Sequence, residues 1–89
     1  MAIFFVLPTG DSDPILRALK DKQSQGSVDF TPLPKNGFVV NYSGTTQELS
    51  NLLGVTDGSS APGVVVAISS YYGRAPTTLW EWIKSRWDA

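Results

Sequence analysis

The chain contains neither cysteine nor histidine, and this absence limits how so short a sequence can hold itself together. Disulfide bonds cannot form, and a structural zinc ion would lack the ligands it normally needs. At 89 residues the chain is expected to form a single domain over residues 1–89, of the size at which one core can just sustain a fold. Its stability is therefore expected to come from packing, with the aromatic side chains as the main source.

Composition and charge narrow the functional class. Hydrophobic residues make up 42% of the chain and charged residues 17%, which is typical of a folded domain. The net charge of −1, with both signs interspersed, disfavours nucleic acid as a partner, because binding to a phosphate backbone normally needs a basic surface. No apolar stretch is long enough to span a membrane, and the first residues lack the basic region of a signal peptide. We therefore predict a cytoplasmic protein without membrane contact.

The first elements are a strand and a helix. The apolar run AIFFVL at residues 2–7 stops at Pro-Thr-Gly and predicts a strand covered on both faces. A helix follows, for which Asp13 is the predicted N-cap and Pro14 the first helical residue. Asp11 and Asp13 lack the further oxygen ligands that calcium needs, so they are interpreted as part of the helix start and not as a metal site.

Two strands joined by a turn are predicted next. Pro32 and Pro34 cannot donate to a ladder, so residues 28–33 are expected to form a short or edge strand. Asn36-Gly37 is a strong hairpin signal. In residues 38–42, Phe38, Val40 and Tyr42 are expected to share one face.

The second helix has the clearest boundaries in the sequence. Thr45 and Glu48 have the spacing of a capping box, while Gly54 and Val55 fit the end of a helix in a Schellman motif. An exposed loop is predicted over about residues 56–63. The β-branched run GVVVAI at residues 63–68 then predicts a buried strand.

All three tryptophans fall in the last fifth of the chain. A helix from Thr78, with Glu81 at capping-box spacing, is expected to run through Trp87. Leu79, Trp80, Ile83 and Trp87 would gather on one side, leaving Trp82 and Arg86 at a margin. We expect this helix mainly to complete the core and its margin to be a candidate surface.

The order of these elements predicts an α+β fold. The chain contains a strand-helix-strand unit twice, and a hairpin joins the two units. This is the pattern of a split βαβ, ferredoxin-like sandwich (β-α-β-β-α-β), here with an added C-terminal helix. If residues 28–33 form only a loop, the alternative is a small three-stranded parallel α/β sheet.

Two candidate sites lie toward the end of the chain. The turn before the last helix combines hydroxyls, a glycine and an arginine next to a helix N-terminus, where an anion such as phosphate is favoured. The predicted anion ligands are Ser70, Gly73, Arg74, Thr77 and Thr78. The predicted interaction surface consists of Tyr71, Tyr72, Arg74, Trp82 and Arg86.

Two segments suggest a nucleic-acid alternative. KNGFVVNY at residues 35–42 and AIFFVLP at residues 2–8 resemble the RNP1 and RNP2 segments of the RNA-recognition motif, over about fifteen positions. The first of them lacks the Gly-aromatic-Gly-aromatic spacing of that motif. The resemblance implies that Phe4, Phe38 and Tyr42 stack on bases from an open sheet face, in RNA or single-stranded DNA.

Catalysis is not expected. Without histidine or cysteine the commonest general base and the strongest nucleophile are missing, and no catalytic or phosphate-loop motif is present. We predict no cofactor and no metal. The preferred function is a small non-catalytic interaction module, an adaptor, regulator or inhibitor. Its aromatic and apolar surface would bind another protein or a second copy of the same chain, since large exposed apolar patches usually mark such contacts.

Overall fold

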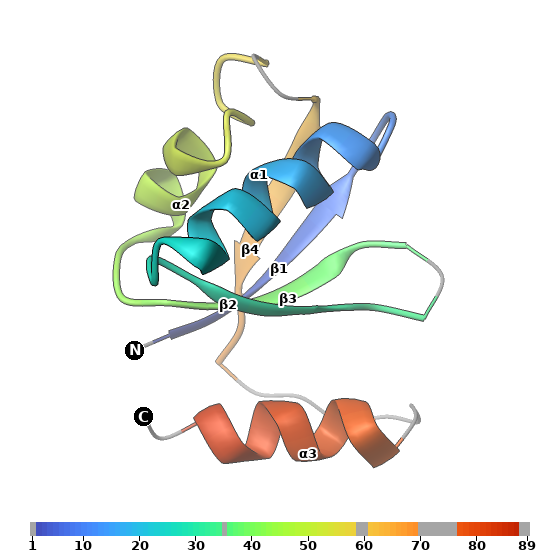
Figure 1. Ribbon diagram of the computed structural model, residues 1–89, viewed down its shortest axis with the longest axis vertical. Coiled ribbons are helices and arrows are strands. Elements are labelled where there is room, and N and C mark those ends of the chain that lie inside the picture. Colours follow the sequence, from blue (N-terminus) through green and yellow to red (C-terminus); the bar gives the residue numbers. More distant parts are fainter. Residues whose placement is uncertain (1, 35, 59–60, 70–76, 88–89) are drawn as a thin grey trace.

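The computed structural model describes residues 2–34, 36–58, 61–69 and 77–87. These residues form a small α+β domain (Figure 1). In chain order its elements are β1 (Ala2–Pro8), α1 (Asp13–Ser24), β2 (Asp29–Pro32), β3 (Phe38–Tyr42), α2 (Thr46–Leu52), β4 (Gly63–Ala67) and α3 (Thr77–Arg86).

The four strands form one sheet in the order β2-β3-β1-β4, with every neighbouring pair antiparallel. The predicted α+β class is therefore confirmed, and the three-stranded parallel alternative is wrong. Residues 29–32 pair with β3 despite their proline, because Pro32 is the last residue of a strand at the edge of the sheet. β1 and β3 occupy the centre.

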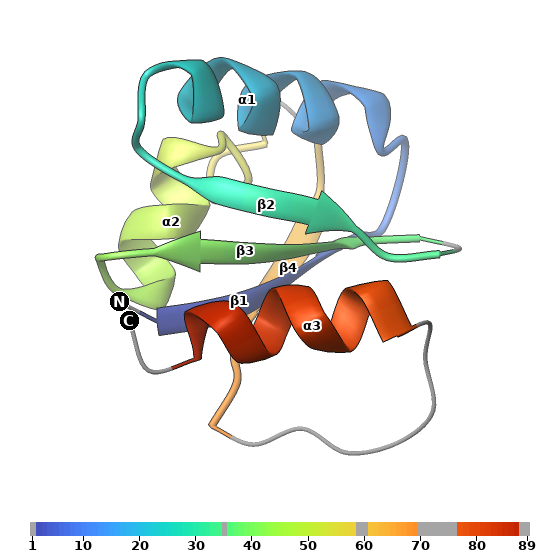
Figure 2. The same ribbon diagram turned by 60° about the horizontal axis from the view of Figure 1, so that its bottom comes forward.

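Helices cover both faces of the sheet, α1 and α2 on one side and α3 on the other (Figures 1 and 2). Side chains alternate between these faces along each strand. Phe4, Val6 and Val40 belong to the larger apolar cluster, with Ile15 of α1 and Leu49 of α2. The smaller cluster on the α3 side has three buried members, Ile3, Val39 and Ile83.

Local hydrogen bonds define the ends of α2 as the sequence predicts. The amide of Glu48 donates to Thr45 Oγ1 at 3.1 Å, and the amide of Thr45 donates to Glu48 Oε1 at 2.9 Å, completing the capping box. At the other end Gly54 adopts a φ of 73°, and the amide of Val55 donates to the carbonyl of Ser50 at 3.0 Å. The predicted Schellman motif is therefore confirmed.

The start of α1 differs from the prediction by one residue. Ser12 is the N-cap, and Asp13 is the first helical residue. The carboxylate of Asp11 accepts from the amide of Asp13 at 3.0 Å, so an aspartate does satisfy an amide at this helix start, from a position two residues earlier than expected. Pro14 lies in the first turn, where its missing N–H has no consequence.

The prediction of a buried strand over residues 63–68 is wrong. β4 lies at the edge of the sheet, and the side chains of Val64 and Val66 are 49% and 40% exposed. A β-branched run predicts extended backbone but does not determine how many sides of a strand are covered. In the preceding loop, Thr56, Asp57, Gly58 and Pro62 are exposed as expected, whereas Ala61 is buried.

Candidate functional site

Helix α3 lies against the sheet and brings its tryptophans with it (Figure 2). Ile83 is buried against Ile3 and Val39. Trp80, Trp82 and Trp87 are each partly buried around this contact, so the helix mainly completes the core, as predicted from the sequence. Their remaining exposed surface gives α3 an aromatic margin.

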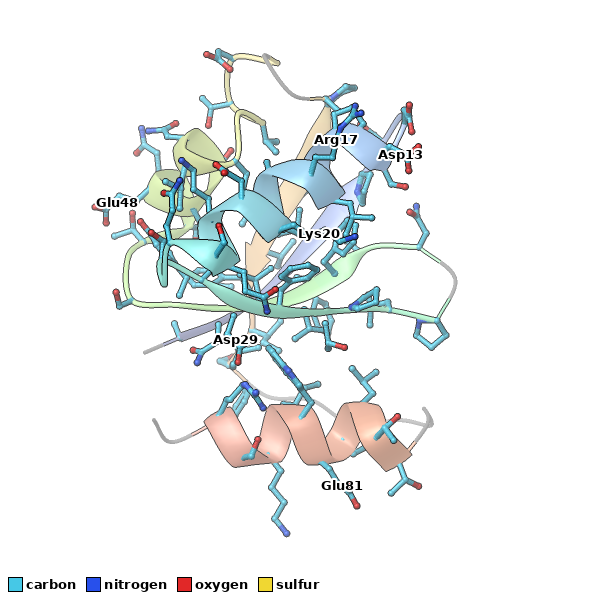
Figure 3. All side chains as sticks on the ribbon, viewed as in Figure 1. Asp13, Arg17, Lys20, Asp29, Glu48 and Glu81 are labelled. Atoms are coloured by element: carbon cyan, nitrogen blue, oxygen red, sulfur yellow. The ribbon has the colours of Figure 1, made fainter. Side chains whose placement is uncertain are left out.

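Arg86 joins this margin to the sheet. Its Nε donates to the Oδ2 atom of Asp29 in β2 at 2.6 Å, across 57 positions of sequence. Its Nη1 donates to the carbonyl of Trp82 at 3.1 Å, and the guanidinium stacks 4.2 Å from the centroid of a Trp82 ring. Figure 3 shows Asp29 on the side of the sheet that faces α3 and Glu81 on the far side of that helix. Arg86 is therefore engaged within the molecule, where it holds Trp82 in place.

A pocket of about 260 Å³ lies beside Trp82, between α3 and the hairpin that joins β2 to β3. Two of its residues, Trp82 and Thr78, come from different sites predicted from the sequence, one from the interaction surface and one from the anion site. The lining residues are Thr31, Pro32, Pro34, Thr78, Leu79 and Trp82. Their ring and aliphatic surfaces suit an apolar side chain, and the two threonine hydroxyls supply polar groups at its wall.

Sequence reasoning missed the β2 side of this pocket. Pro32 and Pro34 signal an edge strand and a turn, but nothing in the local pattern indicates that they line a pocket with residues of the last helix. The ion pair between Asp29 and Arg86 carried no signal either, because its partners are remote in the chain. Both features follow from where α3 lies on the sheet.

The remaining predicted site residues divide into two groups. Thr77 and Thr78 are exposed at the start of α3. Five others lie outside the described residues: Ser70, Tyr71, Tyr72, Gly73 and Arg74. Both the anion site and the part of the interaction surface formed by these residues stay predictions.

The aromatic side chains required by the nucleic-acid alternative are not on an open face. Phe4 and Phe38 are buried in the cluster beneath α1 and α2, and Tyr42 packs against it. The rings of Phe4 and Tyr42 contact one another, with centroids 6.4 Å apart. Their expected placement on an open side of the sheet is wrong, because two helices cover that side.

A second exposed apolar area lies at the β4 end of the sheet. Leu7 is 38% exposed, and it pairs with Val64, one of the two exposed valines of β4. Phe5, in turn, pairs with Val66. Helix α3 lies toward β2, since its Arg86 pairs with Asp29 and its Thr78, Leu79 and Trp82 line a pocket together with Pro32. It therefore covers only part of its face of the sheet.

Within the described ranges, no three acidic side chains come close enough together to hold a metal ion. The helices there are also too short or too polar to cross a membrane. Comparison with protein families, curated proteins and solved structures finds no match to this chain.

Proposed function

We propose that this protein is a small, non-catalytic interaction module that accepts an apolar side chain of a partner protein in the pocket beside Trp82. The observation that carries the proposal is the pocket itself, in which a tryptophan, a leucine and two prolines converge from α3 and the β2–β3 hairpin. Binding surfaces in proteins are enriched in such aromatic anchors.

The contacts around Trp82 favour binding because they fix the indole before a partner arrives. Arg86 stacks on the ring and is itself held by Asp29, so little side-chain freedom remains to be lost on association. An ordered aromatic wall is the arrangement expected of an interaction hot spot.

We also propose that the fold is a ferredoxin-like sandwich and that the protein is located in the cytoplasm. The element order, with β1 and β3 as central antiparallel strands, supports a ferredoxin-like sandwich to which α3 is added on the opposite face. The absence of cysteine fits a reducing compartment such as the cytoplasm.

Site-specific photo-cross-linking tests the pocket. A benzophenone-bearing amino acid placed at Thr78 lies in the pocket wall, whereas the same group at Glu81 points away from the sheet and is the matched control (Figure 3). On irradiation in cell extract, we expect the variant at position 78 to form an adduct with one defined protein that the variant at position 81 does not form.

Adding Trp82→Ala to the variant at position 78 is expected to abolish this adduct while circular dichroism shows that the chain remains folded. Equal labelling from positions 78 and 81 would reject the pocket as a binding site. An adduct with RNA in place of protein would reject the proposed function in favour of the nucleic-acid alternative.

A further inference from the structure

At the outer edge of β4, none of the described residues pairs with the outward-pointing backbone groups of the strand. The amide of Ile68 donates to the carbonyl of Ile3, and the amide of Thr9 donates to the carbonyl of Pro62, each at 3.1 Å. Because bonded and non-bonded pairs alternate along an antiparallel ladder, Phe5 with Val66 and Leu7 with Val64 are also bonded pairs. The N–H and C=O groups of Gly63, Val65 and Ala67 consequently point away from β1, toward the open edge.

The two edges of the sheet differ in how they are protected. At the β2 edge, Pro32 has no N–H to offer, and the charged Asp29 is tied to Arg86. Proline, charge and short length are the usual devices that prevent an edge strand from pairing with another chain. β4, with the sequence GVVVA, has neither proline nor charge. The alternating N–H and C=O groups along the open edge of β4 are the pattern with which another β-strand pairs.

We propose that β4 pairs antiparallel with β4 of a second copy of this chain, joining two sheets into one of eight strands. The outward-pointing N–H and C=O groups determine which residues of the two β4 strands pair. Val65 would face Val65 of the other copy on the two-fold axis, and Gly63 would face Ala67, with each pair exchanging both of its hydrogen bonds. This surface is separate from the pocket beside Trp82, so the proposal does not depend on the proposed function.

The same register accounts for the exposed valines. Val64 of one copy and Val66 of the other form non-bonded pairs, in which side chains approach most closely. Both valines project on the α3 side of the sheet, where each is 40% exposed or more in the single chain. No charged residue occurs within β4, so two identical strands meet without like-charge repulsion.

Concentration-dependent hydrogen exchange tests this register directly. As the protein is concentrated from micromolar to millimolar, we expect sedimentation equilibrium to report a dimer. We expect the amides of Val65 and Ala67 to become protected over the same range. The amides of Val64 and Val66, which bond to β1, should be protected at every concentration.

Charge placed at the interface provides the second measurement. Val66→Lys puts an ammonium group at two symmetry-related positions, and we expect the dissociation constant of the dimer to rise about tenfold. Ser27→Lys is the charge-matched control, since Ser27 is exposed and lies next to β2, at the opposite edge of the sheet. Val66→Thr keeps the β-branch and is expected to change dimerisation less.

Three results would overturn the proposal. The first is a monomer at every concentration, and the second is protection of Val65 that does not change with concentration. The third is a dimer weakened equally by Val66→Lys and Ser27→Lys. Cross-linking at position 78 is unaffected by any of these results, so a failure of the dimer and a failure of the pocket are distinguishable.

Discussion

Asn41 is buried on the α3 side of β3, between Ile3 and Asp29 in the register of the sheet. Its side chain is only 6% exposed, and its Oδ1 atom has no hydrogen-bond partner among the described residues. A buried polar atom without a partner costs free energy, because its bonds to water are lost and not replaced. We therefore expect this position to lower the stability of the fold.

We predict that Asn41→Val raises the free energy of unfolding by about 1 kcal/mol, since valine removes the unpaired oxygen and suits a strand. Urea denaturation followed by circular dichroism measures the change. Asn41→Asp is the control and should lower stability, because it adds a carboxylate next to Asp29. If Asn41→Val proves destabilising, Oδ1 has a partner in solution, such as a water molecule.

Helix α3 depends on the sheet for its stability. A ten-residue helix is marginal in water by itself, so the apolar face that it buries must stabilise it. Ile83 is the buried residue of this face, and it contacts both central strands through Ile3 and Val39. The neighbouring Lys84 is exposed and makes no comparable contact.

We predict that Ile83→Ala lowers the free energy of unfolding by about 3 kcal/mol, because it leaves a cavity between α3 and the sheet. Lys84→Ala, one position away on the exposed side, should change it by less than about 0.5 kcal/mol. Chemical denaturation of the two variants under identical conditions provides the comparison. Similar losses for both would mean that α3 is not packed through Ile83.

The elements themselves were largely predictable from local signals. The capping box of Thr45 and Glu48 and the glycine at the end of α2 act over a few residues, and both are confirmed. Whether the side chains of an element are buried was less predictable, because burial depends on where the other elements lie. Val64 and Val66 have the composition of a buried strand, yet β4 is the edge strand in the sheet order and both valines are exposed on the α3 side.

At the scale of the whole molecule, the sequence predicted a four-stranded α+β domain. It did not predict which helices cover each of the two faces of the sheet. The apolar side chains of Ile3 and Phe5 required a cover, and in the structure they pack in one cluster with residues of α3. The candidate site was predictable only in part. Trp82 and Thr78 could be named from the sequence, whereas their meeting with Pro32 is a tertiary contact without a local pattern.

The two apolar clusters share the central strands β1 and β3, so we predict that the molecule unfolds as one unit. All three tryptophans lie in the last fifth of the chain, and their fluorescence therefore reports undocking of that region. Circular dichroism near 220 nm (roughly the helical band) reports all the helices together. The two thermal transitions should coincide. A fluorescence transition at lower temperature would show that α3 detaches first.

The position of α3 in the chain order has a consequence for biosynthesis. The β1 and β3 side chains that it covers are made first, whereas Ile83 follows about half a chain after the last of them. During translation, one side of the nascent sheet stays bare until residue 83 has left the ribosomal exit tunnel. Until then this side is a surface that a ribosome-associated chaperone can shield from other nascent chains.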